Sequence, residues 1–207
     1  MDNCTSLSNV IIPGGINIIN EYVFYGCNSL TRLEIPSSIS LISKGSFSQC
    51  GSLEFIKIGS SVTSIEDYAF SFCYSLRNIS IPASLRSIGK YAFQGCFFLE
   101  HVFIPQSVVS IGEYAFLDCK SLVTISIPSY INKINIGTFK NCEKLVQVDL
   151  PDTLKSIESS AFDNCLSLTK ISIPSSITAI KANTFVGCPF DKIQIKPSVT
   201  SIEGSAF

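Results

Sequence analysis

Nine cysteines are the residues of this chain with the widest choice of chemistry, because thiols serve as metal ligands, redox centres and disulfide partners. Their spacing is regular. Each follows the previous one by 23 positions without an insertion, at Cys4, Cys27, Cys50, Cys73, Cys96, Cys119, Cys142, Cys165 and Cys188. A fixed period of this kind is the signature of a repeat architecture, so we interpret the thiols as equivalent members of stacked repeats.

Equivalent positions in stacked repeats place the thiols side by side in a row, whereas zinc needs four ligands that converge tetrahedrally. Neighbouring repeats in such a stack, which we call rungs, lie about 4.8 Å apart, and this separation of the Cα atoms would permit a disulfide. However, side chains in register have parallel Cα–Cβ directions, and the number of cysteines is odd. We therefore interpret the cysteines as small buried hydrophobic residues whose weak S–H donors face loop carbonyls, and we expect no metal and no cofactor.

His101 is the only histidine, so a Ser/His/Asp or Cys/His catalytic set would need it. It lies five positions after Cys96, on the predicted outward face of a strand. A lone exposed histidine is usually a surface residue, and no Gly-rich phosphate loop leads from a strand into a helix. The sequence therefore predicts that the protein is not an enzyme.

The other repeated positions indicate the elements that carry these residues. Counting from each cysteine, eight units have Leu at +3, Ile at +15 and Phe at +20. Alternating aliphatic residues at +6 and +8 predict a short strand with one buried face, which Pro at +9 ends in all of these units except the one with Gly59. Aliphatic residues at +12 and +15 predict a second short strand, and the Ala-Phe segment predicts a tight turn or a short 3₁₀ piece.

One unit cannot bury its apolar side chains alone, but parallel stacking joins identical residues into continuous ladders. We therefore predict a β-rich solenoid of about nine 23-residue turns over 1–207, as one domain with no long helix. The last unit drops one residue after Cys188, and its pattern continues one place early. Phe207 ends the chain in mid-unit, so we expect a fragment of a longer array.

Charge and hydropathy exclude several partner classes. The formal net charge is -1, with 15 basic and 16 acidic residues interspersed, which disfavours binding to nucleic acid or to an anionic membrane. Apolar runs are too short to insert as a membrane-spanning helix. The N-terminal segment lacks the basic and apolar regions of a secretory signal.

The unit L-x-x-I-x-I-P-S-S-I-x-x-I-x-x-x-A-F-x-x-C resembles the BspA-type, or Treponema-type, leucine-rich repeat over essentially the whole chain. The resemblance implies a leucine-rich-repeat solenoid at the cell surface or secreted. It implies adhesion to a protein, such as a host matrix or cell-surface protein, or to a glycan. Without a signal sequence, an intracellular, cytoplasmic interaction module is one alternative. A purely structural spacer is another.

Repeats differ from one another mainly at +5 and +7, which point away from the predicted core. These columns form a strip suited to an extended partner. Exposed aromatic side chains on it, Phe55, His101 and Phe103, are candidate anchors, although drift on an unselected face explains them equally well. The candidate ligand-binding residues are Arg32, Phe55, Lys57, Asn78, His101, Phe103, Gln147 and Asp149.

Overall fold

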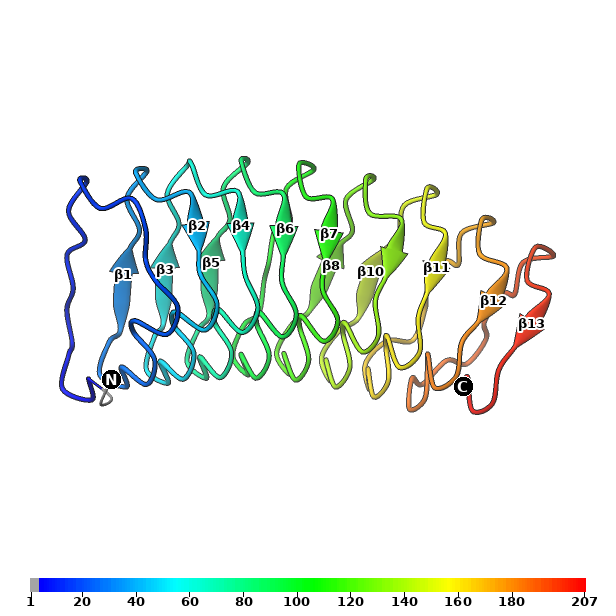
Figure 1. Ribbon diagram of the computed structural model, residues 1–207. Helices are drawn as coiled ribbons and strands as arrows, with labels where there is room; N and C mark the ends of the chain where they lie inside the picture. Colours follow the sequence, from blue (N-terminus) through cyan, green and yellow to red (C-terminus); the bar gives the residue numbers. More distant parts are fainter. Residues whose placement is uncertain (1–3) are drawn as a thin grey trace.

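The repeated apolar positions place two short strands in successive coils, as a computed structural model that describes residues 4–207 shows (Figure 1). The predicted single domain also includes residues 1–3, which lie outside this described part. The coils stack along one axis, so each strand pairs with its equivalent in the next repeat. All strand pairs are parallel. No helix occurs between residues 4 and 207.

The first row of strands lies within the predicted strand segments and covers positions +5 to +7 in five units. Its strands are β1 (Arg32–Glu34), β3 (Phe55–Lys57), β5 (Asn78–Ser80), β8 (Thr124–Ser126) and β10 (Gln147–Asp149). In each strand the central residue is buried and its two neighbours face outward, which follows from the period of two along an extended chain. The predicted strand and its buried face are confirmed.

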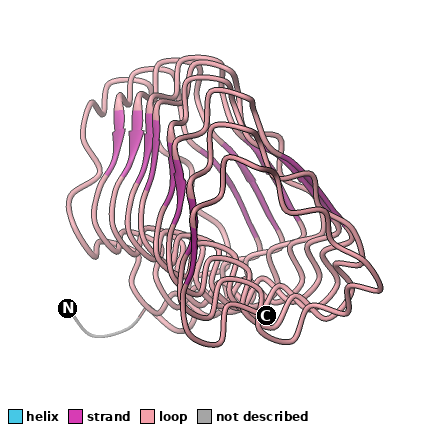
Figure 2. Cartoon of the chain, turned by 90° about the vertical axis from the view of Figure 1, so that its right-hand side faces the viewer, coloured by secondary structure: helices cyan, strands magenta, loops and turns pink. Residues whose placement is uncertain are grey.

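The second row contains the two-residue strands that end at the repeated isoleucine. They are β2 (Leu41–Ile42), β4 (Ser64–Ile65), β6 (Ser87–Ile88), β7 (Ser110–Ile111), β9 (Lys133–Ile134), β11 (Ser156–Ile157), β12 (Ala179–Ile180) and β13 (Ser201–Ile202). The end-on view in Figure 2 shows the two rows on opposite sides of the coil, with turns along the lower side. The predicted second strand is therefore confirmed.

The turn before each cysteine is tight but is not a 3₁₀ helix. Its hydrogen bonds span three residues, as between the Cys73 N–H and the Phe70 carbonyl. Tyr68 and Phe72, however, have positive φ values of 57° and 59°. A right-handed helical turn cannot pass through such residues, so the segment forms separate hydrogen-bonded turns.

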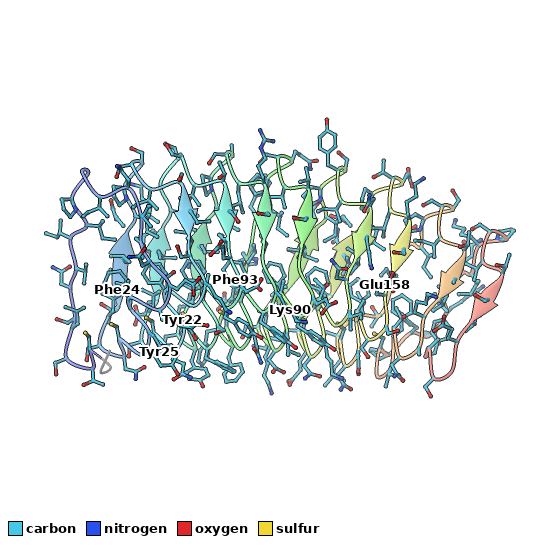
Figure 3. The ribbon with its side chains drawn as sticks, viewed as in Figure 1. Tyr22, Phe24, Tyr25, Lys90, Phe93 and Glu158 are labelled. Atoms are coloured by element: carbon cyan, nitrogen blue, oxygen red, sulfur yellow. The ribbon has the colours of Figure 1, made fainter. Side chains whose placement is uncertain are left out.

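A ladder of phenylalanines fills the interior beside these turns. Phe47 and Phe70 stack with ring centroids 5.4 Å apart and an interplanar angle of 6°. Phe24 and Phe93 occupy equivalent places in their coils (Figure 3). Seven consecutive members are fully buried: Phe47, Phe70, Phe93, Phe116, Phe139, Phe162 and Phe185. The solenoid thus has about seven complete turns, slightly fewer than the nine predicted, because the end units are open on one side.

Candidate ligand-binding face

The cysteine ladder lies inside the coil and connects neighbouring rungs. The Cys73 thiol donates a hydrogen bond to the Phe47 carbonyl at 3.1 Å, and the Cys119 thiol donates to the Phe93 carbonyl at 3.3 Å. The interpretation of the thiols as donors to loop carbonyls is confirmed. Burial raises the pKa of the Cys50 thiol to about 12 and holds that of Cys73 well above its usual value. These thiols are therefore poor nucleophiles.

Metal-ligating side chains do not converge in the described part of the chain, where no group of three or more His, Cys, Asp or Glu residues could hold an ion. The cysteines from Cys27 to Cys188 are free thiols. The described coils also contain no helix with the length and hydrophobicity of a membrane span.

Pairing of adjacent strands brings most of the candidate residues into one column. Arg32 is opposite Phe55, and Phe55 is opposite Asn78. Isolated bridges then join Asn78 to His101 and His101 to Thr124. Thr124 pairs with Gln147, which completes a column across six rungs. Positions that are 23 residues apart in sequence are thus direct neighbours in space.

The second column of the face contains Lys57, Phe103 and Asp149. Lys57 lies 3.5 Å from the Glu34 carboxylate in an exposed ion pair. Asp149 accepts a hydrogen bond of 2.8 Å from the Gln147 side chain. Phe103 is 74% exposed, the largest exposure of any phenylalanine in the described residues. We name the eight residues Arg32, Phe55, Lys57, Asn78, His101, Phe103, Gln147 and Asp149 the recognition face.

Phe97 and Phe98, in the turn that precedes His101 and Phe103, contact basic and aromatic neighbours. The Arg77 guanidinium lies 5.2 Å from the Phe98 ring centroid, and Phe97 packs against Tyr74 at 5.2 Å. Phe98 is 47% exposed, whereas Phe97 is half-buried. Both rings therefore belong to a surface cluster beside the recognition face.

Sequence reasoning missed a groove of about 870 Å³ at the N-terminal part of the recognition face. It crosses four rungs and is lined by Arg32, Phe55 and Lys57 together with residues that were not among the candidates, including Ile11 and Gly59. Gly59 was the sequence feature that could have indicated this groove, because it alone replaces proline at +9 in the first eight units.

A smaller groove of about 380 Å³ lies on the second row, over β4 and β6. Two of its three lining carboxylates accept backbone hydrogen bonds. Glu66 accepts a 2.9 Å hydrogen bond from the Lys44 N–H, and Asp67 accepts one of 2.7 Å from the Lys90 N–H. Lys90, labelled in Figure 3, also pairs with Glu113 at 2.6 Å. These contacts connect adjacent rungs, so we interpret this groove as structural.

Known structures resemble this fold closely. A leucine-rich repeat protein from Bacteroides ovatus is 32% identical, with a TM-score of 0.89 over 95% of this chain and 54% of that one. This chain therefore spans about half of that protein. A leucine-rich repeat protein from T. pallidum is 35% identical, with a TM-score of 0.71 over 72% of this chain and 70% of that one.

A more distant leucine-rich repeat protein, from Eubacterium ventriosum, is 27% identical with a TM-score of 0.53, over 88% of this chain and 65% of that one. No curated protein matches the chain. The model of the BspA type leucine rich repeat region matches residues 1–122 and 86–207, which together cover the full length. The chain belongs to the BspA-type leucine-rich-repeat family.

Proposed function

We propose that this protein is a non-catalytic scaffold that binds another protein or a glycan through its recognition face. The observation that carries the proposal is the separation of constant from variable positions. The repeated Leu, Ile, Phe and Cys residues are buried in the interior coils, whereas the residues that differ between repeats share one exposed surface. A rigid solenoid presents such a surface without ordering it on binding, which lowers the entropic cost of association.

Family membership supports an adhesive role at the cell surface or after secretion, with host matrix proteins, other cell-surface proteins or glycans as partners. A row of parallel strands suits this role because contacts can be distributed over many rungs. Exposed aromatic side chains within the row supply the anchors that often dominate binding energy. Phe103 and His101 lie near the middle of the recognition face, where such anchors are most effective.

The test uses a panel of purified matrix proteins and glycans, immobilised and probed with the intact chain. A triple variant, Phe55→Ser with His101→Ser and Phe103→Ser, should lose the interactions that the wild type shows, while it stays folded and its melting temperature falls only by the small amount expected for the half-buried Phe55 ring. The matched control replaces three exposed apolar residues outside the face, Val109→Ser, Tyr130→Ser and Leu166→Ser. Wild-type binding by the first triple variant would reject the recognition face.

The spacer alternative makes a different prediction. A spacer needs length and stiffness alone, so exchanging the +5 and +7 residues among repeats would leave its function intact. A binding scaffold would lose its partner after the same exchange, because the buried ladders are unchanged while the surface pattern is scrambled.

A further inference from the structure

Gly59 lines the groove on the recognition face, at the repeat position where the adjoining units have proline. Gly59 lies between Pro36 and Pro82, the residues at the same repeat position on the adjoining rungs. A Cβ atom at Gly59 would lie only 2.5 Å from the Pro36 carbonyl oxygen. The backbones therefore approach closely at this point, and Pro36 and Pro82 both line the groove.

The charges in the groove are not balanced. Lys57 and Glu34 form an ion pair, but the Arg32 side chain has no hydrogen bond or ion pair with any residue between 4 and 207. Arg32 is directly opposite the half-buried Phe55 in the strand register. A planar guanidinium without a partner is suited to bidentate recognition of a carboxylate.

The apolar part of the lining lies beside the Arg32 guanidinium. Ile11 is 85% exposed, and Phe55, Pro36 and Pro82 are among the other apolar residues of the lining. Backbone groups of β1 and β3 pair with each other, so a partner would contact side chains and would not add a strand at this place. The combination of the Arg32 guanidinium, which has no charged partner between residues 4 and 207, with apolar side chains favours a peptide that carries a carboxylate over a neutral glycan.

The length of the groove indicates the conformation of the occupant. Four rungs at about 4.8 Å span about 14 Å, which is the length of about four residues of extended chain. We propose that this groove binds an extended peptide segment of a partner protein that places a carboxylate beside apolar side chains. The carboxylate pairs with Arg32, and the apolar side chains pack against Phe55 and Ile11. The proposal rests on the proposed function and specifies the partner of the same face.

The experiment measures fluorescence anisotropy with three labelled octapeptides, in which Leu alternates with Asp, with Lys or with Ser. The Leu–Asp peptide should bind the intact chain at least about tenfold more tightly than the other two. Arg32→Gln should remove this preference, and Arg32→Glu should transfer it to the Leu–Lys peptide. Lys170→Gln is the matched control, because Lys170 is an exposed cation in the same column outside the groove.

Three outcomes would overturn the inference. The first is equal binding of the Leu–Asp and Leu–Lys peptides, or no binding of the Leu–Asp peptide. The second is Leu–Asp binding that Arg32→Gln leaves unchanged. The third is Arg32-dependent binding of an acidic oligosaccharide, such as a hyaluronan fragment, that is tighter than binding of the Leu–Asp peptide.

Failure of this inference differs from failure of the proposed function. If peptide binding does not need Arg32 but the Phe55, His101 and Phe103 triple variant loses its matrix-protein or glycan interaction, the groove assignment is wrong and the scaffold assignment stands. If the triple variant retains every interaction of the wild type, the recognition face itself is wrong.

Discussion

The Cys96 thiol donates a hydrogen bond of 3.2 Å to the backbone carbonyl of Phe70, which lies 26 residues earlier in the chain. The same carbonyl accepts the backbone N–H of Cys73 at 3.3 Å. The thiol therefore connects two rungs at a carbonyl that already closes a turn. Equivalent bonds recur along the interior, which explains why cysteine recurs where its chemical reactivity is suppressed.

Replacing Cys96 by alanine should lower the free energy of unfolding by about 1–2 kcal/mol, because a weak hydrogen bond and part of the core volume are lost. Urea denaturation followed by circular dichroism measures the change. Val109→Ala, at a position that is 52% exposed, is the control and should stay within about 0.5 kcal/mol of the wild type. Equal stability of the two variants would contradict the structural role of the thiol.

Alkaline pH should destabilise the protein through its buried thiols. The Cys50 thiol has a pKa of about 12 in the folded chain because of burial, whereas an unfolded cysteine titrates near about 8.5. Between these values the folded state holds more protons than the unfolded state, so the free energy of unfolding falls as pH rises. Below about pH 8 this contribution is constant.

Urea unfolding between pH 7 and 11 checks the alkaline effect. Burial also raises the pKa of Tyr91, so Tyr91 also lowers the free energy of unfolding as pH rises. A control variant is therefore needed. The difference between the wild type and Cys50→Ala isolates the thiol and should shrink as pH rises. A difference that stays constant with pH would show that Cys50 titrates normally in the folded state.

The phenylalanine ladder offers a comparison between two residues of one type. Phe93→Ala should cost about 3–5 kcal/mol, because it removes a fully buried ring that stacks on Phe70 and Phe116. Phe103→Ala should change stability by less than about 0.5 kcal/mol, because that ring is 74% exposed. Chemical denaturation of both variants provides the measurement, and a similar loss in both would place Phe103 in the core.

Close approach between rungs makes replacement of some glycines destabilising. A Cβ atom at Gly89 would lie 2.5 Å from the backbone nitrogen of Asp67, which cannot move aside as a side chain would. Gly89→Ala should therefore lower the free energy of unfolding by about 1–3 kcal/mol. Gly204→Ala meets no atom within 4 Å and serves as the neutral control in thermal unfolding. Equal melting temperatures would mean that the rungs are less tightly packed at Gly89.

Much of the fold could be predicted from the sequence because the 23-residue period converts spatial neighbours into fixed sequence separations. Ile56 and Ile79 are buried and pair across rungs, as alternation at +6 and +8 predicts. Positive φ values at Tyr68 and Phe72 could not be predicted, because tyrosine and phenylalanine carry no local preference for that conformation. Hydrogen bonds between adjacent rungs, such as Tyr68 N–H to the Lys90 carbonyl, impose it instead.

The recognition face could also be predicted only in part from the sequence. The sequence by itself determined which residues share a column, since Arg32, Phe55 and Asn78 follow one another at the period of the repeat. Only the tertiary structure decided that Lys57 pairs with Glu34 while the Arg32 side chain has no charged partner between residues 4 and 207, and that the strands around Gly59 line a groove. Periodicity determines which backbone positions are neighbours, but the direction of each long side chain and the depth between rungs depend on packing in three dimensions.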